Sequence, residues 1–138
     1  MNARKAHAIP RGMGTVFAIA LGGALGAVGR YALSSQITHW IGPGFPWGIL
    51  AVNVAGCFVM GVIAELGALT LNLSPEMRAF LTTGILGGFT TFSAFALDSA
   101  VMIERGDWGA TVLYVSASVL GSIAALFLGL GVVRSFAS

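Results

Sequence analysis

The stretch Gly87-Gly88-Phe89-Thr90-Thr91-Phe92-Ser93-Ala94-Phe95 lies in the middle of an apolar segment, residues 80–103, that is long enough to cross a lipid bilayer. Two adjacent glycines and three hydroxyl side chains weaken a helix at that place. In hydrocarbon, each freed backbone amide or carbonyl costs several kcal/mol unless protein or water binds it. We therefore predict that this membrane helix is broken near the midplane, as in transporters whose ion or substrate sites lie at such breaks.

The composition of the whole chain indicates a membrane protein. Hydrophobic residues make up 57% of the 138 positions and charged residues only 9%, whereas about a quarter of the residues in a soluble domain are charged. A span needs roughly 20 apolar residues, so the chain has room for four spans and little else. We predict an all-α membrane protein with four transmembrane helices, at residues 15–35, 47–70, 80–103 and 110–133.

The two ends of the chain differ from these spans. Residues 1–14 are polar and basic and are predicted to form a flexible tail, residues 15–133 the four-helix transmembrane domain, and residues 134–138 a short C-terminal tail. A basic lead before an apolar run can resemble a signal peptide. Here the run continues past any plausible cleavage point, so we expect a retained helix. Met1 and Met13 are both candidate start positions.

Glycine content and charge bear on assembly. Many of the 20 glycines lie inside the spans, where small residues let membrane helices approach closely, so we expect tight packing within the chain and against a partner. With the N-terminus inside, the tail, Arg78 and Arg134 would be cytoplasmic and Arg105 external. Without the tail this bias is weak and compatible with insertion in both orientations, whereas the tail favours one orientation. Two opposed copies would form an inverted repeat.

A few polar residues at membrane depth are candidates for an ion path. Asn53 interrupts an apolar run, and such an amide either joins helices or donates hydrogen bonds to a small anion. Arg30 either snorkels to the interface or forms a cationic vestibule that attracts anions. Asp98 either anchors a polar track or pairs with Arg30. A stripe of hydroxyls on the last span either lines a polar path or bonds back to its own helix: Thr111, Tyr114, Ser118 and Ser122.

In these segments the chain resembles the Fluc-type fluoride channels, the CrcB-like family of small four-helix membrane proteins. The resemblance covers residues 15–133. It rests on Gly26-Ala27-Val28-Gly29-Arg30, on Asn53-Val54-Ala55-Gly56 and above all on residues 84–95. The Thr-Phe-Ser-x-Phe end of that last string is highly specific for the family.

The resemblance implies an antiparallel, dual-topology homodimer in the inner (cytoplasmic) membrane, with two pores for passive fluoride export. It implies a central structural sodium ion bound by the backbone carbonyls of Gly87 and Thr90, which agrees with the oxygen ligands that hard cations prefer. Phenylalanine ring edges are partly positive and attract an anion without trapping it. The implied vestibule residue is Arg30, and the implied pore residues are Asn53, Phe92, Phe95, Tyr114, Ser118 and Ser122.

Two other classes of function compete with this one. A proton-coupled exporter of the small multidrug-resistance type has the same four-helix design, but it needs an acidic residue deep in the first span, where this chain has Arg30. A purely structural subunit would explain the glycines but not the hydroxyl-rich third span. We expect no enzyme activity, because no nucleophile, base and orienting group recur at a usable spacing. The expected partners are the lipid bilayer and a second copy of the chain, with no nucleic acid.

Overall fold

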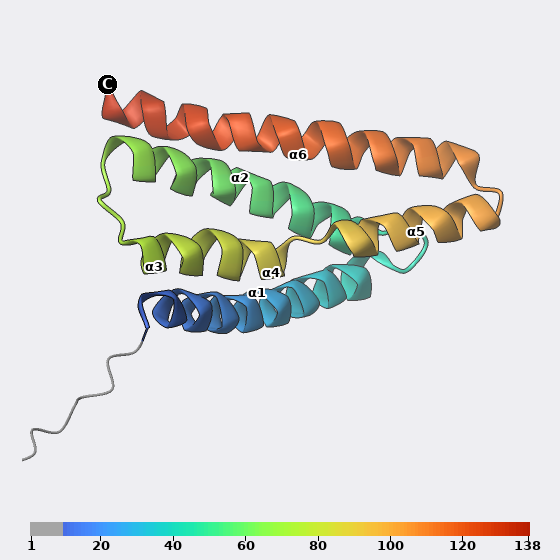
Figure 1. The fold of residues 1–138 in the computed structure, drawn as a ribbon. Helices are drawn as coiled ribbons and strands as arrows, with labels where there is room; N and C mark the ends of the chain where they lie inside the picture. The colour runs from blue at the N-terminus through green and yellow to red at the C-terminus, as the bar shows by residue number, and fades with distance from the viewer. Residues whose placement is uncertain (1–9) are drawn as a thin grey trace, which may run out of the picture.

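The computed structural model describes residues 10–138, and all the regular structure within them is helical. Figure 1 shows the long helices lying side by side, with the chain reversing direction at each turn. Four segments of this described part are long and apolar enough to span a membrane: Gly12–Ile41, Trp47–Leu69, Pro75–Glu104 and Trp108–Ala137. The prediction of an all-α, multi-pass membrane protein with four spans is confirmed.

The outer helices are longer than the apolar runs that predicted them. Helix α1 covers Arg11–Ile41, so residues 11–14 of the predicted tail are helical, while residues 1–9 lie outside the described part of the chain. It stops only at Gly42, whose φ of 101° favours glycine. Helix α6 covers Trp108–Ala137 and so includes most of the predicted C-terminal tail. Hydropathy identifies only the part of a helix that lies inside lipid. Both helices continue beyond their apolar segments, α1 to Ile41 and α6 to Ala137.

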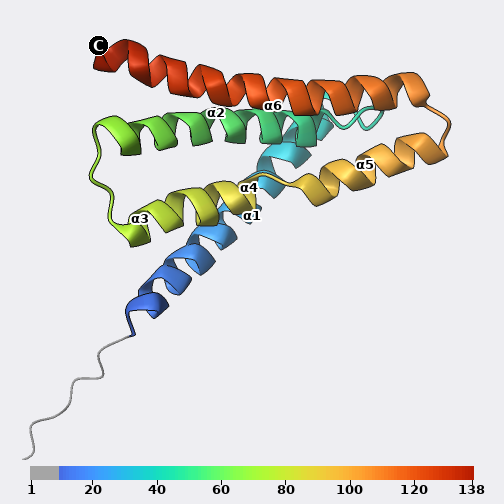
Figure 2. The same cartoon turned by 45° about the horizontal axis from the view of Figure 1, so that its top comes forward.

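Two pairings organise the bundle. Helix α2, Trp47–Leu69, lies along α6, and the two are joined at one end by the Arg134 guanidinium, which donates to both Glu65 carboxylate oxygens at 2.9 and 3.2 Å. Helix α1 instead packs against the first half of the third span, and Figure 2 shows it crossing under that half. A Cβ atom at Gly61 or Gly129 would collide with the backbone of the facing helix. The predicted close packing through glycine is confirmed for these positions.

The third span is the irregular one. It begins with α3, Pro75–Ala79, continues through a π-helical segment η1, Phe80–Leu86, and one short turn α4, Gly87–Phe89. Thr90 and Thr91 then have extended backbone angles, with ψ of 156° and 118°, before α5 begins and runs over Phe92–Glu104. We call this two-residue stretch the Thr90–Thr91 interruption. The π-helical segment was not predicted, and Gly87 is helical, with φ of −64° and ψ of −36°.

Candidate functional site

Asn53 of α2 holds the Thr90–Thr91 interruption. Its Nδ2 donates to the Thr91 carbonyl at 3.0 Å, and its Oδ1 accepts from the Thr91 amide at 2.7 Å. The Thr91 amide, which the interruption frees, is therefore satisfied without water. The Thr91 carbonyl, which as the N-cap of α5 accepts the first bond of that helix, gains a second donor. Of the two roles considered for Asn53, the structure contains the interhelical one. The second Nδ2 hydrogen remains available for another acceptor.

The interruption also redirects two hydrogen bonds away from the carbonyls of Gly87 and Thr90. In a continuous helix those carbonyls would accept from the amides of Thr91 and Ala94. Here the Thr91 amide donates to Asn53, and the Ala94 amide donates at 3.2 Å to the Thr91 hydroxyl, which caps α5. The donors that a helix supplies to these two carbonyls thus go elsewhere. The N-terminus of α5, which carries partial positive charge, begins at the same place.

A cavity of about 290 Å³ opens beside the interruption, and we call it the α4–α5 cavity. It brings together side chains from the second, third and fourth spans. Five of the six predicted pore residues line it, while the sixth, Tyr114, does not. The polar and aromatic lining residues are Asn53, Cys57, Thr90, Thr91, Phe92, Phe95, Ser118 and Ser122.

Ser118 is the fully buried polar group of this cavity that has no hydrogen-bond partner among the described residues. Its side chain is 6% exposed, and its Oγ is buried with no hydrogen bond to any described residue. Ser99 and Thr111, in contrast, each donate to a carbonyl of their own helix at 2.8 Å. The back-bonding alternative therefore fits Thr111 but not Ser118. Leaving a buried hydroxyl unpaired costs free energy, so the position suits a bound water or ion.

The two phenylalanines after the interruption differ in their surroundings. Phe95 is 8% exposed, whereas Phe92 is 78% exposed, although their ring centroids are only 5.3 Å apart. Phe95 also lies 5.3 Å from the ring of Tyr114. One ring of the pair is thus part of the core of the chain, and the other projects from it.

Tyr114 is fully buried, and its hydroxyl donates to Asp98 Oδ2 at 3.2 Å. Of the two partners considered for Asp98, the structure contains the polar track on α6 and not Arg30. Asp98 also lines a second, larger cavity. The Asp98–Tyr114 pair therefore links one cavity to the aromatic wall of the other.

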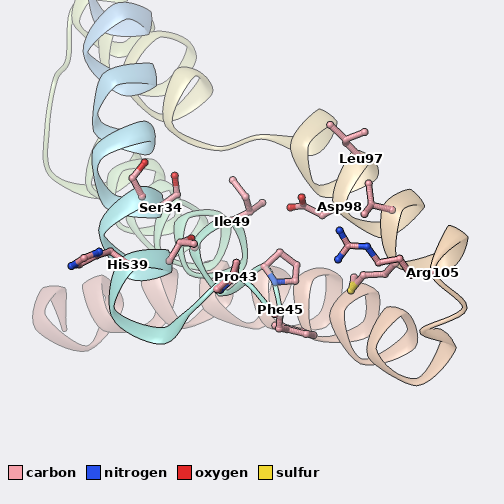
Figure 3. A pocket seen from close by; sticks show the side chains of 15 residues that line it. Ser34, His39, Pro43, Phe45, Ile49, Leu97, Asp98 and Arg105 are labelled. Atoms are coloured by element: carbon pink, nitrogen blue, oxygen red, sulfur yellow. The ribbon is translucent and has the colours of Figure 1, made fainter.

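This second cavity, of about 750 Å³, lies between the end of α1, the turn after it and α5, and we call it the α1–α5 cavity. Figure 3 shows the Asp98 carboxylate and the Arg105 guanidinium projecting into it, with His39 at the α1 side. Arg30, the predicted vestibule residue, is half-buried on α1 and lines neither cavity. The sequence shows Arg105 only as an orientation signal, because its distance in the sequence from α1 hides this shared space.

Residues 17–130 match the family described as "CrcB-like protein, Camphor Resistance (CrcB)". The chain belongs to the CrcB-like family. This match confirms the resemblance drawn from the three sequence strings, and it extends over all four spans.

Relatives with similar sequences carry the name "Fluoride-specific ion channel FluC". The one from Rhodospirillum centenum is 51% identical over 123 residues, which cover 89% of this chain and 98% of the relative. The one from Rhizobium etli strain CIAT 652 is 54% identical over 121 residues, 88% of this chain and 97% of the relative. A protein from Agrobacterium fabrum is 51% identical over 117 residues, 85% and 94% respectively. The family is therefore one of ion channels, not of enzymes.

Proposed function

We propose that this chain forms a fluoride channel that lets fluoride leave the cytoplasm passively across the inner membrane. The relatives from Rhodospirillum centenum and Rhizobium etli, which this chain matches over nearly their whole length, are named fluoride-specific ion channels. The observation on this chain that carries the proposal is the unpaired, buried Ser118 hydroxyl in the α4–α5 cavity. A fluoride ion accepts strong hydrogen bonds, and this cavity supplies donors that lack an acceptor.

The chemistry of the α4–α5 cavity supports an anion. The second Nδ2 hydrogen of Asn53 and the hydroxyls of Ser118 and Ser122 are hydrogen-bond donors. The edges of Phe92 and Phe95 add partial positive charge, as does the N-terminus of α5. None of the lining residues is acidic. No charged side chain of the described residues lines this cavity, which suits conduction because the ion must also leave.

We further propose that the anion passes between the two cavities along Tyr114. The Tyr114 ring packs on Phe95, which lines the α4–α5 cavity, and its hydroxyl binds Asp98, which lines the α1–α5 cavity. The hydrogen bond from Tyr114 disperses part of the negative charge of the carboxylate, and the Arg105 guanidinium in the same cavity compensates for the rest. In this proposal the α1–α5 cavity is the vestibule and Arg105 is its cationic group. Arg30, which lines neither cavity, would attract anions only at longer range from α1.

An antiparallel homodimer with the interruption at the bilayer midplane is also part of the proposal. Phe92 projects from the protomer at the interruption, so a second copy would complete the α4–α5 cavity. The carbonyls of Gly87 and Thr90 have lost their helical donors, and such oxygens fit a hard cation. These two carbonyls would hold the structural sodium ion, whose positive charge would neutralise the oxygens gathered where the subunits meet.

The proton-coupled exporter has less support. Helix α1 carries Arg30 and, over its whole length, no acidic residue that could exchange protons with a cationic drug. The acid of the neighbouring third span, Asp98, is half-buried and is bound to Tyr114. We therefore retain the channel as the proposed function.

A flux measurement tests this proposal. Purified protein is reconstituted into liposomes loaded with potassium fluoride or potassium chloride, and a potassium ionophore starts anion efflux. We expect rapid fluoride loss at a fluoride-selective electrode and no chloride loss above protein-free liposomes. Absence of fluoride efflux would refute the channel, and equal chloride efflux would refute its selectivity.

A further inference from the structure

The α4–α5 cavity contains a thiol that the proposed anion path does not yet include. Cys57, the single cysteine of the chain, is free and half-buried, and it lines this cavity. It follows Asn53 by four residues on α2, so both side chains lie on the same helical face. The Asn53 amide, which binds Thr91, and the Cys57 thiol therefore lie on successive turns of α2 and form one wall of the cavity.

The opposite wall gives an independent reason to regard this part of the cavity as a ligand space. Ser118 is contributed by α6, the helix that packs along α2, and its buried Oγ has no hydrogen-bond partner among the described residues. Ser122, one turn further along α6, lines the same cavity. A volume of about 290 Å³ exceeds by several-fold the roughly 30 Å³ that one water occupies in the liquid. The cavity that Cys57 and Ser118 both line is thus large enough to hold several small polar molecules.

We propose that Cys57 lines the anion path, which continues from Asn53 between α2 and α6, and that covalent modification of its sulfur closes that path. This inference rests on the proposed channel function. The relevant ligand class is a small, neutral thiol-specific reagent such as methyl methanethiosulfonate. The Cys57 thiolate attacks the sulfenyl sulfur, a methyl disulfide forms on Cys57, and the reagent's sulfur–sulfur bond breaks to release methanesulfinate. The added methylthio group occupies the space in which an ion must move.

The test compares fluoride efflux before and after reaction in the same proteoliposomes. Because the chain has one cysteine, intact-mass measurement reports directly how much of the wild-type protein carries the methylthio group. We expect fully labelled wild type to lose efflux down to the level of protein-free liposomes. Reduction of the mixed disulfide with dithiothreitol should restore the starting rate.

Two variants serve as controls, each compared with its own unlabelled rate. Cys57→Ser should keep its rate after treatment, because it has no thiol. Val59→Cys in the Cys57→Ser background places a thiol on an exposed part of α2 that does not line the cavity. It should be labelled without losing its rate. Block of Cys57→Ser, or equal block of the Val59→Cys protein, would overturn the assignment.

Labelling itself gives a result that does not depend on conduction. Val119 lines the α4–α5 cavity from α6 and is exposed, so Val119→Phe adds bulk to the cavity at small cost to folding. It should slow the labelling of Cys57 several-fold. If unlabelled wild type moves no fluoride, the channel proposal fails, and this labelling rate still decides whether Cys57 faces the cavity. Unchanged labelling in Val119→Phe, no labelling of folded wild type, or normal efflux from fully labelled wild type would each overturn the inference.

Discussion

The side-chain amide of Asn53 forms two hydrogen bonds with the backbone of Thr91, at 2.7 and 3.0 Å, across 38 positions of sequence. An amide side chain has the same donor and acceptor as a peptide group, so Asn53 supplies the acceptor that the Thr91 amide lacks and a further donor to the Thr91 carbonyl. The Asn-Val-Ala-Gly string of the second span and the Thr-Phe-Ser-x-Phe string of the third thus meet in one structural unit. Asn53 can stabilise the interruption and still offer its remaining donor hydrogen to an anion.

Removal of the two hydrogen bonds between Asn53 and Thr91 should destabilise the fold. Asn53→Ala leaves the Thr91 amide without a partner and removes one donor from the Thr91 carbonyl, and a buried unpaired group costs about 1–3 kcal/mol. We expect a clearly lower melting temperature in detergent and loss of fluoride efflux. Thr70→Ala is the control, because Thr70 is an exposed hydroxyl at the end of α2 that bonds only to its own helix. A melting temperature of Asn53→Ala equal to that of the control would contradict the structural role of the Asn53–Thr91 hydrogen bonds.

Gly56 and Thr90 form a second contact that a pair of substitutions can test. A Cβ atom on Gly56 would collide with Thr90 Cγ2 and lie 3.2 Å from Phe89 Cδ1. Gly56→Ala should therefore cost about 1–3 kcal/mol by overpacking and reduce efflux by displacing the interruption. Thr90→Ser removes the obstructing methyl but keeps the hydroxyl, which donates to the Leu86 carbonyl at 2.9 Å.

The double variant Gly56→Ala/Thr90→Ser should recover most of the melting temperature and efflux lost in Gly56→Ala. Gly131→Ala is the control for a glycine-to-alanine change in a helix, since nothing lies within 4 Å of its Cβ position. If Thr90→Ser gives no recovery, Thr90 is not the group that Gly56 accommodates.

The sequence predicted the four spans and the region of the interruption because both depend on local composition. The position of the interruption within that region depends on tertiary contacts. The adjacent glycines suggested a break at residues 87 and 88, yet these are helical, and the extended residues are the two threonines. Asn53 and the Thr91 hydroxyl provide partners there, and no sequence pattern shows which threonine a distant amide will bind. The exposure of Arg105 to the α1–α5 cavity was missed for the same reason.

Gly87 tests the sodium site that the resemblance implies. Its Cβ position meets only the Thr82 carbonyl at 3.6 Å, so the protomer has room for a side chain there. We expect Gly87→Leu to leave the protomer folded but to weaken the dimer, because the side chain would crowd the carbonyls that hold the ion. Wild-type dimer should persist longer on dilution in sodium than in N-methylglucamine, and Gly87→Leu should lose this difference.

Gly131→Leu is the matched control for that experiment, because its Cβ position is open. Gly129 is unsuitable, since a side chain there would collide with the Phe58 carbonyl and separate α2 from α6. If sodium has no effect on the wild-type dimer, or if Gly87→Leu and Gly131→Leu behave alike, the proposed sodium site is wrong.

Dual topology can be tested at the turn between α5 and α6. Gly106 has φ of 77°, a conformation that favours glycine, so a probe cysteine belongs on the exposed neighbour Asp107, which forms no side-chain cap. In a Cys57→Ala background, Asp107→Cys should react with a membrane-impermeant maleimide in two populations, one from each face of the membrane. Reaction of the whole population from one face of intact cells would exclude insertion in both orientations.

Phe92 and Phe95 separate an aromatic anion site from simple packing. Both rings line the α4–α5 cavity, but Phe92 is exposed in the protomer and Phe95 is buried against Tyr114. Isoleucine keeps the apolar character and removes the ring edge. We expect Phe95→Ile to lose about 1–3 kcal/mol of stability, and Phe92→Ile to leave protomer stability nearly unchanged. If ring edges contact fluoride, both variants should lose most of their efflux, including the well-folded Phe92→Ile protein.

Packing alone would give a different pattern, in which efflux follows the amount of folded dimer and Phe92→Ile conducts normally. Phe127→Ile is the control, because Phe127 is an exposed ring on α6 that does not line the cavity. Electrode efflux and size-exclusion profiles measured on the same preparations distinguish the two patterns. Normal efflux from folded Phe92→Ile would remove that ring from the anion path. Normal efflux from both variants would leave the path to Asn53, Ser118 and Ser122, whose hydrogen-bond donors do not depend on the rings.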